Sequence, residues 1–292
     1  MNSNTEPQLR VLCCVPHYFA ERTENTNLGQ WKSVSQQPDI RRHYVEKTIS
    51  SLRNLSALPE VATVDVRVCG IRDNSLVSLD VEFDEPEPLF LVFDTLDWML
   101  ERRQDYDYYL LVEDDVLVPA EVLSNAIAFD QVSMVNEVLH PNRIEVDKGI
   151  AYNADLRTYG QWATQRKLFC GRQLVVNTNP HSAVFVLSAR KLNYCADHAD
   201  LSLRGRFRIG EFGGGMMASA FANFLSPVSL YRMYDDLTFN HVVHQDKFEP
   251  YLPRTYDKLS RVAHSVLPPA LVDAIRWLKC RMSGTSDVGG SE

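Results

Sequence analysis

The feature that most constrains this chain is an apolar stretch, Tyr108–Pro119, with three consecutive carboxylates in its middle. Its letters are YYLLVEDDVLVP, so a run typical of a buried strand leads directly into Glu113, Asp114 and Asp115. Carboxylates beside a buried strand are costly unless a cation meets them. At the carboxyl end of such a strand, that cation is usually a divalent metal, alone or with a phosphate group. The alternative is a solvated acidic turn between the strand and a helix.

Strand-like and helix-like patterns alternate along the first 130 residues. Apolar runs over residues 9–15, 64–70 and 108–112 predict buried strands. Apolar residues at helical spacing predict helices over about 38–55, 89–100 and 119–129. The alternation predicts an α/β fold: a mostly parallel central sheet flanked by helices, in a single globular domain.

Ligands bind such sheets at the carboxyl ends of the strands. Three polar segments fall at those ends: Pro16–Tyr18, Arg72–Ser75 and Glu113–Asp115. The sequence therefore predicts that these three segments form one site.

The second half of the chain is less regular. Residues 140–180 show few clean elements, whereas 182–187 read as a strand, with Ser188 placed to cap the next helix. A glycine-rich loop, 210–215, leads into a predicted helix at about 216–225. His241 and His244 follow later and would share a face if their segment is helical.

Composition narrows the classes of function. With 292 residues, of which 45% are hydrophobic, the chain can bury a large core. Its formal net charge of −8 argues against general nucleic-acid binding, which needs a basic surface. The six cysteines show no CxxC spacing, so reduced cysteines are expected. Neither a signal peptide nor an apolar run of the roughly 18 residues that cross a bilayer is visible, which predicts a cytosolic protein.

Taken in order, these segments resemble the nucleotide-sugar glycosyltransferases of the GT-A fold. The first strand ends in Val15-Pro16-His17-Tyr18, similar to that family's strand-Pro-x-Tyr opening. Arg72–Ser75 resembles the Asp-containing turn that reads the nucleotide base, and Glu113–Asp115 resembles the DxD motif, with Glu in the first position. The resemblance implies a catalytic domain over residues 9–250, with a nucleotide-sugar-binding half, 9–130, and an acceptor half, 131–250.

The resemblance also implies a Mn²⁺ or Mg²⁺ ion that neutralises the donor diphosphate. Asp115 is expected to ligate the metal. Glu113, on the same face of an extended strand, would face the ribose or a metal-bound water. Asp114 points the other way, where it braces the turn or contributes to donor binding. A late histidine, His244 or else His241, is expected as a further metal ligand, and an imidazole ligand would favour Mn²⁺ over Mg²⁺. The alternative is that this histidine is a surface or packing residue.

Two segments are assigned to the nucleotide. Tyr18, which follows Pro16 and His17, is expected to stack on the base. Asp73 is expected to accept a hydrogen bond from the imide N–H of the base, which favours uracil over cytosine. Pro16, Tyr18 and Asp73 are therefore expected to bind the donor. A plain Asx turn is the alternative for Asp73.

On the acceptor side, Glu211 is expected to be the general base of an inverting transfer, because it lies in the glycine-rich loop before a helix. The acidic pair usual in the family is reduced here to this single residue. The alternative is a solvated Glu211 beside glycines that only permit close packing. His181 either faces the acceptor or is a buried structural histidine.

The predicted function is metal-dependent transfer of a sugar from a nucleotide-sugar, expected to be a UDP-sugar, to a glycan or lipid-linked acceptor. Residues 251–282 form a predicted helical segment that either contacts an anionic membrane or packs on the core. Residues 1–8 and 283–292 are expected to be flexible. One alternative, a nucleotidyltransferase, would carry a glycine-rich phosphate loop where this chain has Pro16–Phe19. The other alternative is a non-catalytic module that binds nucleotide-sugar or glycan.

Overall fold

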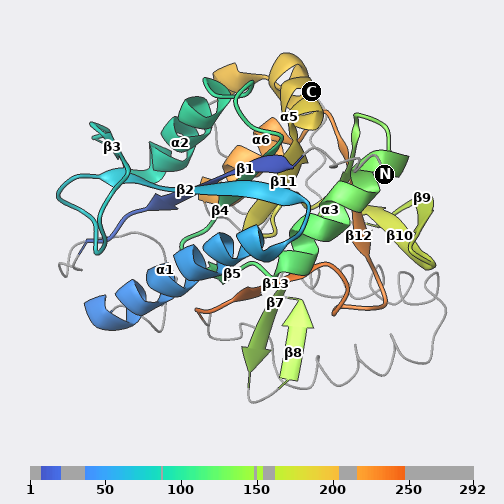
Figure 1. The fold of residues 1–292 in the computed structure, drawn as a ribbon, viewed down its shortest axis with the longest axis horizontal. Coiled ribbons are helices and arrows are strands. Elements are labelled where there is room, and N and C mark those ends of the chain that lie inside the picture. The colour runs from blue at the N-terminus through green and yellow to red at the C-terminus, as the bar shows by residue number, and fades with distance from the viewer. Residues whose placement is uncertain are drawn as a thin grey trace, which may run out of the picture. The chain divides into compact units, whose positions relative to one another are not determined.

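The computed structural model describes residues 8–20, 37–86, 88–147, 150–153, 162–203 and 216–246. These residues belong to one compact unit, Met1–Phe248, and form a mixed α/β structure (Figure 1). Within these ranges, no helix combines the length and the apolar character that crossing a bilayer requires.

The central sheet has five strands: β1 (Leu9–His17), β2 (Val61–Ile71), β3 (Val81–Phe83), β4 (Tyr108–Val112) and β11 (Val184–Ser188). Their order is β11-β4-β1-β2-β3. Strands β4, β1, β2 and β3 run parallel, and β11 pairs antiparallel with β4. The mostly parallel central sheet expected from the alternating pattern is therefore present, and the carboxyl ends of β1, β2 and β4 lie at one edge.

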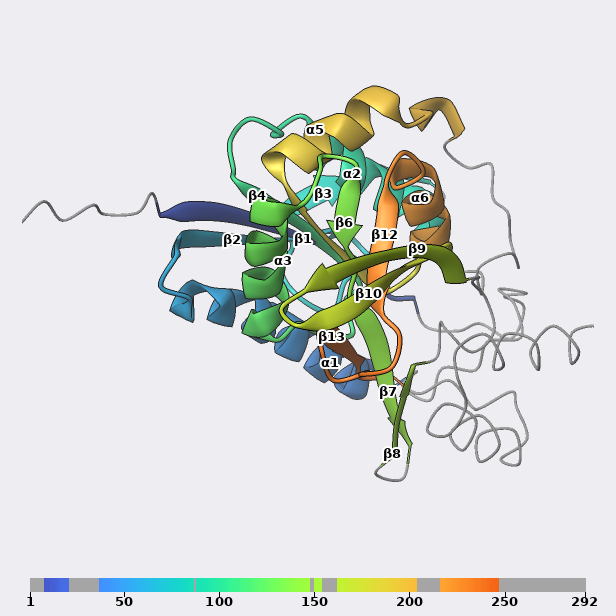
Figure 2. The ribbon, with the colours of Figure 1, turned by 90° about the vertical axis from the view of Figure 1, so that its right-hand side faces the viewer.

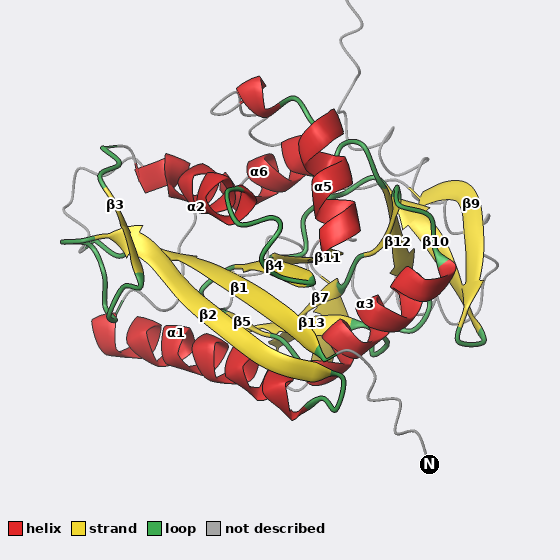
Figure 3. Ribbon diagram, turned by 45° about the horizontal axis from the view of Figure 1, so that its top comes forward, coloured by secondary structure: helices red, strands yellow, loops and turns green. Residues whose placement is uncertain are grey.

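Helices cover both faces of this sheet (Figure 3). One face packs against α2 (Leu91–Leu100), α5 (Ala189–His198) and α6 (Met216–Phe224), and the other against α1 (Pro38–Arg53) and α3 (Ala120–Val132). Leu12 and Cys14 of β1 face the first group of helices, whereas Val11 and Cys13 face the second. Because alternate residues of a strand point to opposite sides, a continuous apolar run is what a strand buried on both faces requires.

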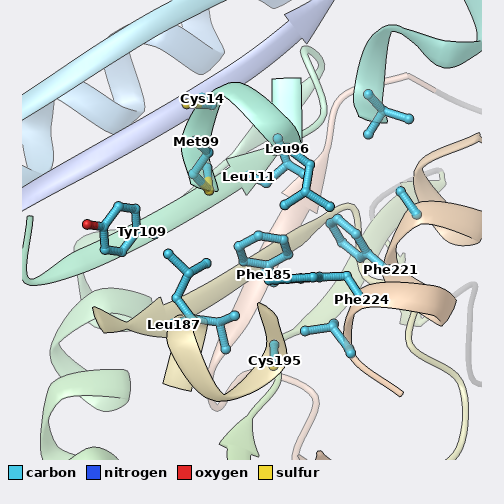
Figure 4. Close-up of a cluster of buried hydrophobic side chains, with 14 of the residues drawn as sticks. Cys14, Leu96, Met99, Tyr109, Leu111, Phe185, Leu187, Cys195, Phe221 and Phe224 are labelled. Atoms are coloured by element: carbon cyan, nitrogen blue, oxygen red, sulfur yellow. The ribbon is translucent and has the colours of Figure 1, made fainter. Parts of the chain in front are cut away.

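Aromatic rings join β11 to α6 in the larger core (Figure 4). The Phe185 ring centroid lies 5.2 Å from that of Phe221 and 5.7 Å from that of Phe224, and all three side chains are fully buried. This contact holds α6 against the central sheet.

Short 3-10 turns accompany the helices at η1 (Asn54–Ala57), η2 (Pro88–Phe90) and η3 (Leu201–Leu203). Ser188 lies at the N-cap position of α5, but its side chain makes no capping hydrogen bond, so the capping role expected for it is wrong.

The expectation of few elements between residues 140 and 180 is also wrong. One further sheet has the order β6-β12-β10-β9, formed by β6 (Glu137–Leu139), β12 (Ser229–Met233), β10 (Arg172–Asn177) and β9 (Trp162–Phe169) (Figure 2). Another has the order β5-β13-β7-β8, formed by β5 (Val116–Leu117), β13 (His241–His244), β7 (Asn142–Asp147) and β8 (Ile150–Asn153). Strands such as β7, with Arg143 and Glu145 buried, lack the apolar pattern on which the expectation depended.

Candidate metal centre

The acidic turn is fixed by the strand that precedes it. β4 is buried along its whole length, and the Glu113 amide donates to the Ala183 carbonyl over 2.8 Å, which extends the pairing with β11. From α1, the Thr48 hydroxyl donates to the Asp114 carbonyl over 3.2 Å. Asp114 and Asp115 are each only 6% exposed, so both carboxylates need partners inside the protein.

Asp114 finds its partners in His17 and Arg41. His17 is fully buried at the end of β1, and its Nδ1 lies 2.6 Å from Asp114 Oδ2. The Leu76 amide donates to His17 Nε2 over 3.0 Å, so the ring carries its proton on Nδ1 and donates it to Asp114. Arg41 Nη2 donates to Asp114 Oδ1. The carboxylate thus ties the end of β1 and the segment after β2 to the acidic turn.

Asp115 lies between two cationic side chains. Arg41 Nη1 donates to Asp115 Oδ2 over 2.7 Å, and His244 Nε2 lies 3.4 Å from the same oxygen. Arg41 Nη1 is also 3.9 Å from Asp246 Oδ2. The guanidinium therefore bridges both aspartates of the turn and approaches a third.

His244 reaches the turn through strand pairing. β13 is antiparallel to β5, with His244 opposite Val116, and the Gln245 amide donates to the Asp115 carbonyl over 2.8 Å. On its other side β13 runs parallel to β7, which carries Glu145. Glu145 Oε1 lies 3.4 Å from His244 Nδ1. The imidazole is therefore placed between two buried carboxylates, one on each ring nitrogen.

These contacts set the charges of the site. Burial by itself raises the pKa of Asp115, but the positive charges of His244 and Arg41 bring it well below its usual value. Burial by itself lowers the pKa of His244, but Asp115 and Glu145 raise it to about 10. Without a metal, the site at neutral pH therefore holds an ionised carboxylate and an imidazolium.

The described residues fit a divalent ion. Glu113, Asp115 and His244 each offer one ligand atom, and these atoms all lie within 4.8 Å of one another. Two carboxylate oxygens and an imidazole nitrogen suit Mn²⁺, and carboxylates completed by water and phosphate oxygens also suit Mg²⁺. A metal bound by Asp115 Oδ2 and His244 Nε2 would replace the Nε2 proton of the imidazolium and compete with the Arg41 guanidinium for the carboxylate.

The segments expected to bind the nucleotide lie next to each other. The Phe19 amide donates to the Asn74 carbonyl over 2.8 Å, so the chain after β1 and the turn after β2 are joined. Tyr18 and Asp73 flank this contact, Tyr18 half-buried and Asp73 exposed. Pro16 lies in β1, in register with Cys69 of β2. No hydrogen bond or ion pair between Asp73 and the acidic turn occurs among the described residues.

The helical arrangement considered for the two late histidines is wrong. They belong to strand β13, and residues three apart on a strand point to opposite faces. His241 Nδ1 lies 2.7 Å from the Thr238 carbonyl oxygen, away from the cluster that contains His244. Only His244 is therefore placed as a possible ligand.

His181 is buried, with Nε2 3.9 Å from Glu113 Oε1. Burial and the positive charges of Arg143 and Arg232 lower the pKa of His181 well below its usual value, so the ring is neutral. Glu211, the expected base, lies outside the described residues together with its glycine-rich loop. The segment 251–282 also lies outside them.

Three residues that contact the site had no role assigned from the sequence: His17, which lies within the predicted site segment Pro16–Tyr18, and Arg41 and Glu145. His17 carried a usable signal, because a polar ring in an apolar strand needs a partner. Arg41 is one of several cations on its helix, and Glu145 lies in a segment without a periodic pattern. For these two residues only the tertiary contacts identify the role.

A scan against protein-family models gives no match to this chain, and a search of curated proteins finds no similar sequence.

Proposed function

We propose that this protein is a metal-dependent glycosyltransferase of the GT-A type, which transfers a sugar from a nucleotide-sugar donor. The observation that carries the proposal is the cluster of Glu113, Asp115 and His244 directly after β4. A largely parallel sheet with an acidic turn at its carboxyl edge is the arrangement that the resemblance implies. That edge is also where α/β sheets bind ligands.

In this proposal the cluster holds Mn²⁺ or Mg²⁺. When bound, such an ion would neutralise the negative charge that develops on the nucleoside diphosphate as its bond to the sugar breaks. Arg41 adds a fixed positive charge beside the same carboxylates, and its guanidinium geometry suits phosphate oxygens as well. His17 orients Asp114 through a hydrogen bond between protein side chains, so this orientation does not depend on a bound ligand.

The donor in this proposal is a UDP-sugar. The contact between Phe19 and Asn74 supports it, because it brings Tyr18 and Asp73 to the same edge as the acidic turn. The acceptor is a glycan or a lipid-linked precursor, and Glu211 is the proposed base for its hydroxyl. The proposed setting is the cytosol, where the segment 251–282 would reach a membrane. Reduced cysteines among the described residues support a reducing compartment.

The test is calorimetric titration of UDP into the protein with and without Mn²⁺. We expect manganese-dependent binding that weakens at least tenfold in Asp115→Asn. Asp130→Asn is the matched control, since Asp130 is an ion-paired carboxylate held by Arg190 and Lys191 at the end of α3. If the affinity for UDP is unchanged by Mn²⁺ and by Asp115→Asn, Asp115 is not a metal ligand for the donor. If UDP, GDP and CDP all fail to bind, the nucleotide-sugar function is wrong.

One observation favours a second candidate, a transferase that neutralises the diphosphate without a metal. Arg41 already occupies Asp115 Oδ2, the oxygen that a metal would share. Turnover that survives EDTA but is lost in Arg41→Met would support this candidate. Product analysis separates the remaining alternatives: a glycosyltransferase releases UDP from a UDP-sugar, and a nucleotidyltransferase consumes pyrophosphate with it. A binding module does neither.

A further inference from the structure

Each ring nitrogen of His244 lies close to a carboxylate oxygen. Nε2 faces Asp115 Oδ2 at 3.4 Å, and Nδ1 faces Glu145 Oε1 at the same distance. These distances are long for hydrogen bonds but short for ion pairs. Glu145 is only 2% exposed and His244 only 4%, so bulk water does not fill either position. Each ring nitrogen of His244 therefore faces a buried carboxylate.

Glu145 is itself held by its own strand. Arg143 precedes it by two residues on β7, on the same face, and Arg143 Nη2 lies 3.8 Å from Glu145 Oε1. Arg143, Glu145, His244 and Asp115 thus form a row of alternating charge that crosses from β7 through β13 to the acidic turn. β7 and β13 run parallel with fixed register, so the row is built on sheet rather than on loop.

A histidine that ligates a metal through Nε2 must carry its proton on Nδ1, and that proton needs an acceptor. Carboxylates commonly take this place behind metal-bound histidines, where they fix the tautomer and the ring orientation. We infer that Glu145 is a positioning residue for the metal centre, which accepts the Nδ1 proton of His244 and so presents Nε2 to the ion. This inference rests on the proposed metal-dependent function.

The test measures Mn²⁺ affinity from the free-ion signal in electron paramagnetic resonance, without substrate and without turnover. Glu145→Gln keeps the size of the side chain but removes its charge, and we expect Mn²⁺ to bind roughly 10- to 100-fold more weakly. The control is Glu137→Gln, another buried carboxylate, which pairs with Lys167 in a different sheet. That variant should leave the Mn²⁺ affinity within about twofold of wild type, because it does not touch the row.

A double-mutant cycle shows whether Glu145 acts through His244. In a His244→Gln background, Glu145→Gln should weaken Mn²⁺ binding by no more than about twofold, because the positioned ring is gone. An equal loss in both backgrounds would mean that Glu145 acts only by its charge, and the positioning role would be wrong. Glu145→Asp gives a second variant: it keeps the charge but withdraws the carboxylate, so the inference expects weakened binding.

The inference and the proposed function fail in different ways. If wild type binds Mn²⁺ and His244→Gln weakens it, while Glu145→Gln and Glu145→Asp do not, only the role of Glu145 is overturned. If wild type binds neither Mn²⁺ nor Mg²⁺, the metal centre is wrong, and the role of Glu145 is overturned with it. Circular dichroism of each variant shows whether it is folded before its affinity is compared.

Discussion

Replacing Arg41 by methionine should have two effects of opposite sign. The guanidinium bridges Asp114 and Asp115, whose side chains are each only 8% exposed, while its own side chain is 19% exposed. Arg41→Met keeps most of the aliphatic stem and removes the charge. The metal-free protein should lose stability, because two buried carboxylates lose their main cation. The same change should strengthen Mn²⁺ binding, because a competitor for Asp115 is gone.

The size of the first effect follows from the geometry. At an effective dielectric constant of about 20, unit charges separated by the 2.7 Å between Arg41 Nη1 and Asp115 Oδ2 attract by about 6 kcal/mol. Desolvation of the pair offsets part of this, and breaking a buried pair by removing one partner costs about 3–5 kcal/mol. Partial exposure of Arg41 puts the expected loss near the lower end, about 3 kcal/mol. A loss of about 3 kcal/mol corresponds to a Tm lower by roughly 6–12 °C.

The assay is urea unfolding in EDTA, repeated over a series of Mn²⁺ concentrations. The control is Arg42→Met on the same helix, because the Arg42–Asp39 pair is exposed and should contribute at most about 1 kcal/mol. A ligand at about 100 times its Kd adds about 2.7 kcal/mol, so Mn²⁺ should restore most of the stability lost in Arg41→Met. We expect Mn²⁺ to bind this variant about tenfold more tightly than wild type, which corresponds to about 1.4 kcal/mol. A variant that is destabilised but gains no Mn²⁺ affinity would refute the competition, and one as stable as wild type in EDTA would refute the ion-pair reasoning.

Three further outcomes are expected. Phe221→Ala should lower the free energy of unfolding by about 3–5 kcal/mol in urea, because its ring is fully buried against Phe185; a loss under about 1 kcal/mol would contradict the packing in Figure 4. His17→Phe keeps an aromatic ring but leaves the Asp114 carboxylate and the Leu76 amide short of a partner, so unfolding should become about 2–4 kcal/mol easier in the same assay; an unchanged midpoint would argue against this hydrogen-bond chain. The metal-free protein should lose stability as the pH rises from 6.5 towards about 10, because the pKa of His244 is raised in the folded state, and a pH series on His244→Gln should lack this slope.

The fold of the first 130 residues could be read from local patterns. Val11 to Val15 and Tyr108 to Val112 are apolar at every position, which is what strands buried on both faces need, and the structure places them in the centre of the sheet. The acidic turn was visible for the same reason, since charges that follow such a run stand out. The spacing of apolar residues and the local composition involve only neighbouring residues, so both can be read directly from the sequence.

Residues 140–180 could not be read in this way. β7 and β9 carry charged residues at positions where an isolated strand would show alternation. β9 pairs with β10, the next strand along the chain, but β7 also pairs with β13, which is distant along the chain. Arg143 and Glu145 are buried next to each other on one face of β7, and Glu145 also lies 3.4 Å from His244 of β13. No local period reports such a partner, which is why this region was expected to hold few elements.

The sequence by itself determined the α/β class, the central strands and the place of the acidic turn. The tertiary structure alone decided what surrounds that turn. The antiparallel pairing of β13 with β5 brings His244 to Asp115, α1 supplies Arg41, and β7 places Glu145 behind the imidazole. The physical reason is that burial and periodicity are properties of neighbouring residues. The charge balance of a buried site depends on which distant strands and helices come together around it.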